Sequence, residues 1–334
     1  MGRMGIRIVP VTTLDPAQAE LAQAWNEATI VSTAATMGED HDARSLASHR
    51  VREESPNWDH RYLAAIDDEA RVVASAALAL PLRDNLQLAL FRIDVLPERR
   101  RHGIGTTLLE HLTQLARDAG RTSLAAETAY PKDGTDPGEA FARRNGFDLA
   151  QTNHRNDLDV TAYAWEKRSE TAEYAIETST DDTLDEWLLD RAILQQRMST
   201  DAPIGELDLE EEDWDAERLR GERQASRKSG RRVIESVARH LATDHLVAFT
   251  QLQVPTAEPE LAYQHDTIVL REHRGHGLGA ALKVANLRAL RAEFPQTRTV
   301  RTWNAVENAP MIAVNEALGH RTTAIEREWQ KRLA

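Results

Sequence analysis

Cysteine is absent from this chain of 334 residues. Disulfide bonds, thiolate metal sites and a cysteine nucleophile are therefore excluded. Long apolar segments are absent too: none approaches the ~20 residues that a helix needs to cross a bilayer, and the N-terminus has no hydrophobic segment typical of a signal peptide. These absences predict a cytoplasmic protein that does not depend on a membrane.

A net positive charge is also lacking. The formal net charge is −13, which argues against general nucleic-acid binding, because that mode depends on neutralising phosphates with Lys and Arg. Much of the acidic excess lies in residues 206–215, and we interpret it as a solvent-exposed face that leads into a helix. The alternative is that these acids attract a cationic acceptor such as an amine.

Two familiar phosphate-binding motifs are missing, the Gly-x-Gly-x-x-Gly motif and the motif that ends in Gly-Lys-Ser/Thr. A different glycine-rich turn is present twice, each time between a short apolar run and a helical run. It reads Arg-x-x-Gly-x-Gly from Arg100 and again from Arg274, 174 residues later. A second landmark, Gly146 and then Gly319, follows at nearly the same offset. A repeat of this length predicts two copies of one domain.

The chemistry of such a turn is that of an anion cradle. Glycines let the backbone approach a ligand closely and adopt angles that a Cβ would forbid. The first N–H groups of the following helix lack intrahelical partners and lie at the positive end of the helix dipole. A phosphate or pyrophosphate fits there, and neighbouring arginines add charge-assisted hydrogen bonds. One such turn alone is equally consistent with a simple helix cap; its duplication favours the cradle.

Apolar periodicity predicts strands and helices that alternate in the same order in both halves, and hence an α/β (α+β) fold. We expect an N-terminal domain at residues 1–162, a charged connector at 163–172 and a C-terminal domain at 173–334. Residues 157–160 are expected to close the first sheet. Residues 231–242 are expected to be helical.

Both turns resemble the acetyl-CoA pyrophosphate loop of the GNAT family of N-acetyltransferases. In that family the loop follows the fourth strand, and an Asn, a small or apolar residue, a Tyr and a Leu-Gly-Phe sequence come later. The corresponding residues of the second half are Asn308, Met311, Asn315 and Leu318-Gly319-His320, whereas only residues 141–147 are recognisable in the first half. The resemblance implies two tandem GNAT-like domains, each with a mixed, mostly antiparallel sheet flanked by helices. This plan is similar to that of mycothiol synthase and of actinobacterial tandem acetyltransferases.

The resemblance implies acetyl-CoA as the acetyl donor and no metal ion. The residues expected to bind acetyl-CoA in the second half are Val269, Leu270, Arg274, Gly275, His276, Gly277, Leu278, Gly279, Ala280 and Asn308. Those in the first half are Val95, Arg100, Arg101, His102, Gly103, Ile104, Gly105 and Thr106.

Strand alternation favours the second half as the catalytic one. In the family, the residue equivalent to Val269 lies beside the acetyl group, and side chains of the same parity share its face. These are Thr267, His265 and Tyr263 in the second half, but Ile93, Phe91 and Ala89 in the first. One face is polar and the other apolar. We therefore expect a catalytic C-terminal domain and an N-terminal domain that is non-catalytic, with or without bound acetyl-CoA.

Three residues are predicted to act in catalysis. His265 is the expected general base, because a histidine exchanges protons near neutral pH; a hydrogen-bonded core histidine is the alternative. Tyr263 would orient the substrate or a water molecule. Asp266 has the opposite parity and is a poorer base unless a β-bulge re-aims it. Asn315 replaces the family's Tyr general acid, and it can bond to the sulfur but cannot supply a proton.

The expected activity is direct transfer of an acetyl group from acetyl-CoA to a primary amine of a small molecule, without an acyl-enzyme. The alternatives are a non-catalytic protein that binds or senses acyl-CoA, and a tRNA-dependent aminoacyl transferase. Neither a nucleic acid nor a membrane is an expected partner. A monomer with an internal pseudo-dimer and a homodimer are both compatible with the repeat, and the acceptor is not identified.

Overall fold

A computed structural model describes residues 5–163, 172–201 and 203–333. The chain forms two compact units. Unit 1 consists of Met1–Thr152, Gly205–Leu209 and Glu326–Ala334, and unit 2 consists of Asn153–Ile204 and Glu210–Ile325. The predicted boundaries stay predictions, because residues 164–171 of the expected connector lie outside the described residues.

Unit 1 contains a sheet with the strand order β1-β2-β3-β4-β5-β12, in which the C-terminal half of β12 forms the last strand. The neighbouring strands from β1 to β4 are antiparallel, and β4 and β5 are parallel. The strands are β1 (Arg7–Val11), β2 (Trp58–Ile66), β3 (Val72–Pro81), β4 (Leu88–Val95), β5 (Ser123–Pro131) and β12 (Arg321–Arg332). The helices are α1 (Ala19–Met37), α2 (Leu46–Glu53), α3 (Ile104–Asp118) and α4 (Glu139–Arg144).

Unit 2 repeats this pattern with the strand order β12-β6-β11-β10-β9-β8-β7, where β12 contributes its N-terminal half. Here β10 and β11 are the parallel pair, and the ladders on either side of them are antiparallel. The strands are β6 (Asp148–Asp159), of which residues 153–159 belong to unit 2, β7 (Tyr174–Thr180), β8 (Arg231–His240), β9 (His245–Pro255), β10 (Leu261–Val269) and β11 (Thr299–Ala305). The helices are α5 (Leu188–Asp201), α6 (Ala216–Lys228), α7 (Leu278–Glu293) and α8 (Ala309–Leu318).

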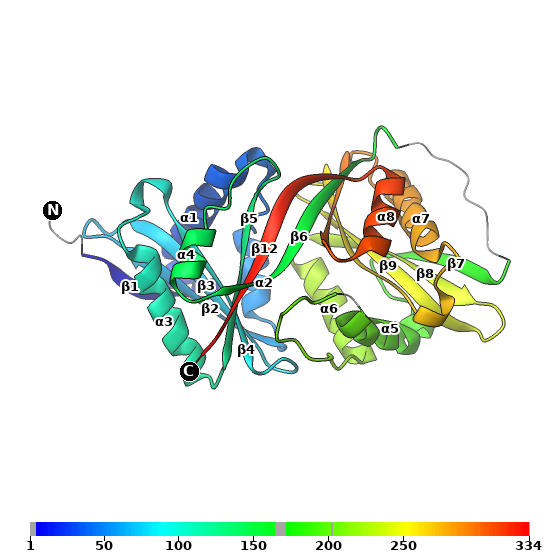
Figure 1. Ribbon diagram of the computed structural model, residues 1–334, viewed down its shortest axis with the longest axis horizontal. Coiled ribbons are helices and arrows are strands. Elements are labelled where there is room, and N and C mark those ends of the chain that lie inside the picture. Colours follow the sequence, from blue (N-terminus) through cyan, green and yellow to red (C-terminus); the bar gives the residue numbers. More distant parts are fainter. Residues whose placement is uncertain (1–4, 164–171, 202, 334) are drawn as a thin grey trace. The chain divides into compact units, whose positions relative to one another are not determined.

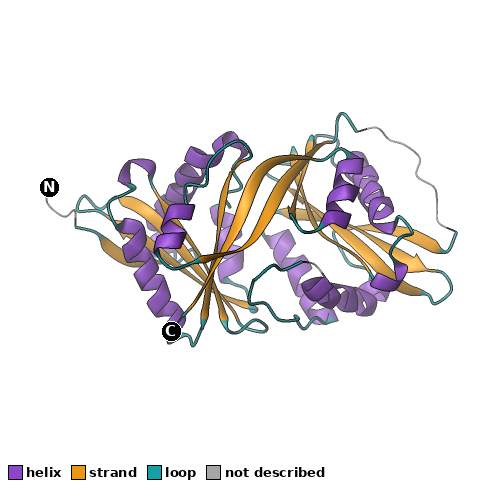
Figure 2. Cartoon of the chain, viewed as in Figure 1, coloured by secondary structure: helices purple, strands orange, loops and turns teal. Residues whose placement is uncertain are grey.

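Helices cover both faces of each sheet (Figures 1 and 2). In β2 of unit 1, Leu63 packs in the core formed with α3, whereas the next residue, Ala64, packs in the core formed with Trp25 of α1. In β8 of unit 2, Ile234 lies with Leu287 of α7, and Val237 lies on the other face with Leu194 of α5. Burial of each large aliphatic side chain contributes about 1.5–3 kcal/mol. The predicted fold of two tandem mixed sheets flanked by helices is confirmed.

The helix expected at residues 231–242 is wrong, because residues 231–240 form β8. This strand pairs with β7 on one side and β9 on the other. Its β-branched residues Val233, Ile234 and Val237 suit a pleated surface flanked by two strands. That pairing outweighs the helix-like spacing of the apolar residues.

The expectation that residues 157–160 close the first sheet is also wrong. Residues 153–159 of β6 pair with β11 of unit 2, where Asp157 lies opposite Arg301. The last strand of unit 1 is instead the C-terminal half of β12, whose Trp329 is buried in the core of that unit. Strand partners far apart in the chain leave no local signal, so the sequence pattern located the strand but not its partner.

Candidate active site

In each unit the parallel strands separate towards their C-terminal ends. β10 pairs with β11 from Leu261 to Tyr263, although β10 continues to Val269. β4 pairs with β5 from Leu88 to Phe91 and continues to Val95 in the same way. Strands that stop pairing leave backbone groups that can bond to an extended ligand. Each unit therefore has strand edges that could bond to an extended, polar ligand.

The two glycine-rich turns have the same backbone structure. Gly103 and Gly277 are the N-caps of α3 and α7, with φ values of 85° and 71°. A side chain would be strained there, and the space that a Cβ would enter has no neighbour within 4 Å. Neither helix has a side-chain cap, so its first N–H groups are available to an anion. The space and the donors fit the phosphates expected from the sequence.

The arginines of the turns bond to the protein itself. Nε of Arg100 donates to the carbonyl oxygen of Val95, and Nε of Arg274 donates to that of Val269, each at 3.0 Å. A second nitrogen of Arg274 donates to Asp201 of α5 at 2.8 Å. These side chains hold the turn against the strand and the first helix, so the phosphate donors we expect are the backbone N–H groups.

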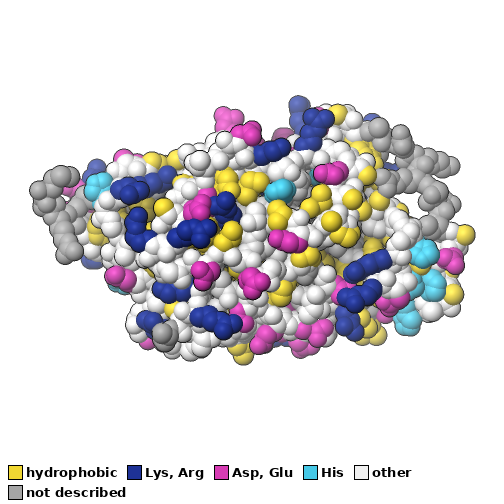
Figure 3. Space-filling model, in the orientation of Figure 1, with side chains coloured by type: hydrophobic (Ala, Val, Ile, Leu, Met, Phe, Trp, Pro, Cys, Tyr) yellow, Lys and Arg dark blue, Asp and Glu magenta, His cyan; other side chains and the backbone are white. Residues whose placement is uncertain are grey.

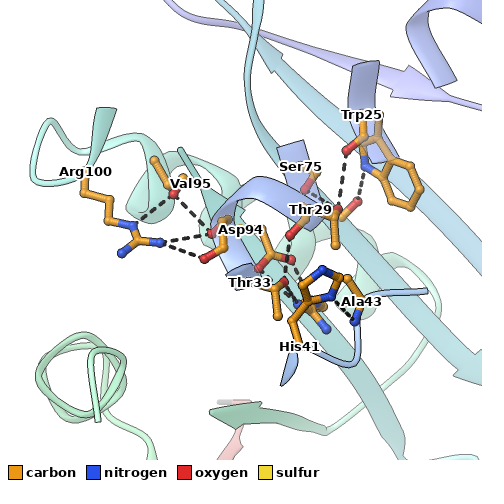
Figure 4. A network of polar contacts seen from close by, with 12 residues as sticks. Trp25, Thr29, Thr33, His41, Ala43, Ser75, Asp94, Val95 and Arg100 are labelled. Atoms are coloured by element: carbon orange, nitrogen blue, oxygen red, sulfur yellow. Dashed lines mark hydrogen bonds and ion pairs between the residues drawn. The ribbon is translucent and has the colours of Figure 1, made fainter. Parts of the chain in front are cut away.

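Arg100 also lies at one end of a polar network in unit 1 (Figure 4). Its Nη2 donates to the carbonyl oxygen of Ser32 at 3.1 Å. One turn earlier in α1, the hydroxyl of Thr29 lies 2.7 Å from that of Ser75 in β3. A further turn back, the indole of Trp25 donates to the carbonyl oxygen of Ala76 in β3 at 3.2 Å. The network fastens α1 and the turn to the same sheet.

The turn of unit 2 is bordered by histidines. The rings of His240 and His273 lie 4.9 Å apart, the ring of His276 lies 5.4 Å from that of Tyr174, and the Tyr174 hydroxyl lies 3.0 Å from Nδ1 of His273. Exposed histidines also gather on the face shown in Figure 3. His276 was predicted to contact the ligand, and it is exposed at the turn. Among the described residues, no group of three or more His, Asp or Glu is arranged to hold a metal ion.

The strand alternation predicted for β10 is wrong at one point. The β9–β10 register shifts between Gln264 and Thr267, where three steps along β10 match two along β9. This β-bulge places Gln264 on the same face as Thr267, and Nε2 of Gln264 donates to Thr250 at 2.9 Å. Tyr263 therefore lies on the opposite face from Thr267 and Val269. A bulge depends on the partner strand, so alternation within one strand does not show it.

The bulge separates the side chains that were expected to act together. His265 is exposed. Asp266 turns towards α5 and accepts a hydrogen bond from Gln195 at 2.7 Å. Tyr263 stacks on Trp303 of β11, with ring centroids 6.1 Å apart. His265 therefore keeps access to solvent at the separated part of β10, whereas Tyr263 lies where the two strands still pair.

Asn315 belongs to a buried polar chain that joins α7, α8 and β11. Nζ of Lys283 donates to Oδ1 of Asn315 at 2.8 Å, and Nδ2 of Asn315 donates to Oδ1 of Asn304 at 2.6 Å. Lys283 and Asn315 are each 2% exposed. Burial lowers the pKa of Lys283 to about 7. Asn308, predicted to contact acetyl-CoA, caps α8 by accepting a hydrogen bond from the Met311 N–H at 3.3 Å.

The equivalent positions of unit 1 are apolar. In the repeat, Leu109 is equivalent to Lys283, Leu112 to Asn286, Ala142 to Asn315 and Phe147 to His320. All four residues of unit 1 belong to one hydrophobic core, whereas all four of unit 2 are buried polar side chains. The fold therefore accepts apolar side chains here, and the polar set is specific to unit 2.

A second buried polar group of unit 2 lies between the sheet and helices α5 and α6. Glu235 accepts from Nε of Arg191 at 2.8 Å, forms an ion pair with Arg223 at 2.6 Å and accepts from Thr183 at 2.9 Å. Arg191 also reaches Gln195, which bonds to Asp266. This charged group connects α5 and α6 to the bulge of β10.

Comparison with known proteins identifies the first half of the chain. Residues 24–147 match the family model described as "Acetyltransferase (GNAT) family". This stretch of the chain therefore matches a GNAT acetyltransferase domain. The search of curated proteins found no match.

Solved structures agree with the tandem GNAT plan. A tandem GNAT protein from the clavulanic acid biosynthesis pathway is 29% identical, with a TM-score of 0.82 over 98% of each chain. A GCN5-related N-acetyltransferase from Sphaerobacter thermophilus is 14% identical, with a TM-score of 0.67 over 98% of this chain and 95% of the other. The glucosamine N-acetyltransferase region of a fungal multi-domain GH3 β-N-acetylglucosaminidase is 13% identical, with a TM-score of 0.68 over 99% of this chain and 38% of the other. The last two share the GNAT fold.

Sequence reasoning missed the most unusual residues of the second GNAT-like unit. Lys283 and Asn286 lie on the apolar face of α7, where the helical pattern otherwise consists of Leu, Ala and Val. Both are polar residues within an apolar stripe, and both are equivalent to a Leu in the first half, so the sequence could have indicated them as unusual. Arg191, Arg223 and Glu235 gave no such signal, because their burial depends on elements that come together only in the fold.

Proposed function

We propose that this chain transfers the acetyl group of acetyl-CoA to the primary amine of a small molecule, and that the reaction takes place in unit 2. One observation carries the proposal. Unit 2 combines a glycine cradle, two separated parallel strands and a buried polar chain between α7, α8 and β11, whereas unit 1 has the first two features with apolar residues in place of the third. Buried polar groups lower stability unless they are satisfied, so their presence in one repeat favours a role in its chemistry.

The residues of unit 2 divide the work as follows. The N–H groups of residues 278–280 bind the pyrophosphate at the helix N-terminus. The free edges of β10 and β11 bond to the pantetheine arm. When bound, acetyl-CoA supplies an acetyl group activated as a thioester. His265, exposed at the bulge, takes the proton that the attacking amine releases.

Unit 1 is proposed to bind acetyl-CoA without turnover. Its cradle has the same φ pattern and open space as that of unit 2, and its residues match the GNAT family model. Phe91, at the end of the paired part of β4, and Ile93, in its separated part, pack against the hydrophobic core with α3. They provide no group that exchanges protons.

The acceptor is proposed to be a small amine that enters from the side of α5 and α6. Asp266 on the bulge and the acidic residues before α6 offer negative charge to a cationic substrate. The clavulanic acid tandem GNAT protein belongs to a small-molecule pathway, which supports an acceptor of this class here. A monomer with two pseudo-symmetric units is sufficient for this scheme.

Acetyl-CoA titration by calorimetry tests the proposal, with Gly277→Asp and Gly103→Asp as a matched pair of variants. Each substitution puts a charged side chain into one cradle at a position with positive φ. We expect Gly277→Asp to abolish one binding event and all release of thiol in a screen of small amines. Gly103→Asp should leave thiol release unchanged.

Three outcomes would contradict parts of this proposal. Thiol release lost only with Gly103→Asp would place the reaction in unit 1. Binding without thiol release for any amine would support an acyl-CoA sensor instead. No binding of acetyl-CoA by the unaltered protein would contradict acetyl transfer as a whole and would favour the aminoacyl transferase.

A further inference from the structure

Lys283 is a buried amine without a counter-ion. It lies on the side of α7 that faces the sheet, between the core residues Leu282 and Val284. Its hydrogen bond is to the neutral amide of Asn315, and among the described residues no carboxylate forms an ion pair with it. A lysine in such a place is held near the balance between its charged and neutral forms, and burial alone accounts for its lowered pKa of about 7.

The hydrogen-bond chain leads from Lys283 to the part of β11 that does not pair with β10. Asn315 bonds to Asn304, which lies three residues beyond the last β11 residue that pairs with β10. Asn304 is half-buried, whereas Lys283 and Asn315 are closed off from solvent. The buried amine is thus two hydrogen bonds away from Asn304 at the end of β11 that does not pair with β10.

The fold does not require a lysine at this position. The equivalent residue of unit 1, Leu109, lies in the hydrophobic core and is 6% exposed. The hydrogen-bond partner of Lys283 is also replaced by an apolar residue in unit 1, because Ala142 is equivalent to Asn315. Lysine and its amide partner therefore occur together in unit 2 and are both absent from the matching place in unit 1.

We propose that Lys283 is a catalytic residue of unit 2 and that its ammonium group donates a proton to the sulfur that leaves the thioester. This role rests on the proposed acetyl transfer and supplies the proton that Asn315 cannot. When the C–S bond breaks, its electron pair goes to sulfur, an Nζ–H bond of Lys283 breaks and an S–H bond forms. Lys283 is left neutral and His265 holds the proton released by the acceptor amine. Once coenzyme A leaves, water can enter its place, from which Lys283 regains a proton and to which His265 loses one.

Asn315 has a positioning role in this scheme. Its Oδ1 accepts from Nζ and its Nδ2 is fixed by Asn304, so the amide orients the ammonium group. An amide does not titrate in the neutral range, and it therefore does not compete with sulfur for the proton. A carboxylate in its place would hold the proton more strongly and raise the pKa of the lysine.

Lys283→Leu tests the proposal, because it copies Leu109 of unit 1. We expect kcat to fall about 100-fold or more, in the range typical for loss of a general acid, while the Kd for acetyl-CoA changes less than about threefold. In the unaltered protein kcat should fall as the pH rises above neutrality, because the acid loses its proton. Lys283→Leu should lack that decline. Arg288→Leu removes an exposed positive charge from the same helix and should leave both kcat and its pH profile unchanged.

The ligand-free protein gives a second readout that does not depend on activity. The folded pKa of Lys283 lies near 7 and the unfolded value near 10.5, so the unfolded chain binds more protons between these values. The stability of the unaltered protein should therefore rise as the pH increases from 7 to 10.5. Lys283→Leu and Lys283→Met should both lose this rise.

The outcomes separate this role from the function on which it rests. An active protein whose Lys283→Leu variant keeps its kcat within threefold and retains the decline above neutral pH would overturn the role of Lys283 alone. Unaltered protein that binds acetyl-CoA but releases no thiol contradicts the proposed function and this role together. If Lys283→Leu does not fold, Lys283→Met provides the same comparisons with a longer apolar side chain.

Discussion

Units 1 and 2 use one backbone plan with two kinds of interior. Under the helix that follows the cradle, unit 1 is apolar and unit 2 contains Lys283, Asn315 and His320. On the other face of the sheet, Tyr62 of unit 1 is the residue equivalent to Glu235 of unit 2. Their partners on the next strand, Ala77 and Gln251, are equivalent in the repeat as well. The comparison shows that the same backbone plan occurs with apolar or aromatic residues at these places. The charged residues of unit 2 are therefore additions that its fold tolerates.

The strands that carry the site differ as well. β4 pairs with β3 in unbroken register up to Val95, whereas β10 bulges between Gln264 and Thr267. In the straight strand, alternate residues point into the core. In the bulged strand, three successive residues point to three environments, with Gln264 buried, His265 exposed and Asp266 bonded to α5. A single extra residue therefore changes which groups a strand presents.

The largest effect is expected from giving unit 1 the lysine of unit 2. Leu109→Lys would bury an amine that has Ala142 in place of an amide partner. If its pKa falls as far as that of Lys283, from 10.5 to about 7, the loss of unfolding free energy at pH 7 is about 5 kcal/mol. Denaturant unfolding measures it. Stability equal to that of the unaltered protein would show that unit 1 is not closely packed there.

Substitution of buried Glu235 in unit 2 and of its equivalent Tyr62 in unit 1 should lower stability by different amounts. Glu235→Gln leaves Arg191 and Arg223 without their buried counter-ion, and we expect a loss of about 4 kcal/mol. Tyr62→Phe removes only the hydrogen bond to the His49 carbonyl oxygen, 3.1 Å long, and should lose about 1 kcal/mol. Equal losses in urea unfolding would contradict the distinction.

Acid sensitivity should be reduced by giving unit 2 the phenylalanine of unit 1. Burial, with a contribution from the charge of Lys283, lowers the pKa of His320 to about 3. The unfolded chain takes up the proton below about pH 6.5 and the folded chain does not, so stability falls with decreasing pH in that range. His320→Phe, which copies Phe147 of unit 1, should recover about 3 kcal/mol at pH 4 and much less at pH 7. Thermal unfolding of both proteins at the two pH values tests this prediction. An equal gain in stability at pH 4 and pH 7 would show that packing alone is responsible.

The smallest effect concerns the bulge. Nε2 of Gln264 donates to Thr250 and to the carbonyl oxygens of Gln251 and His265. Gln264→Leu removes these hydrogen bonds and should cost about 2 kcal/mol. Leu90 is an exposed residue of the straight strand β4, and Leu90→Gln should change stability by less than about 0.5 kcal/mol. The same loss in both variants, measured by urea unfolding, would count against the bulge as the cause.

The sequence by itself determined the repeat, the two cradles and the class of fold. Glycine at positions with positive φ and the run from an apolar strand into a helix are local features, and local features are written in adjacent residues. The offset of 174 residues even holds for long-range bonds, since the N–H groups of Leu96 and Leu270 donate to the carbonyl oxygens of Val73 and Val247. The structure adds geometry to these features without changing them.

Only the tertiary structure decided the interior of the site. The bulge in β10 arises from its pairing with β9, in which three steps along β10 match two steps along β9. The turn arginines brace the protein because a strand-end carbonyl lies within reach of each. Lys283 has a lowered pKa because the fold buries it, and its hydrogen-bond partner is an amide of α8 instead of a carboxylate. Each of these depends on groups brought together from distant parts of the chain, and the free energy of a buried charge is determined by such neighbours, not by its own sequence position.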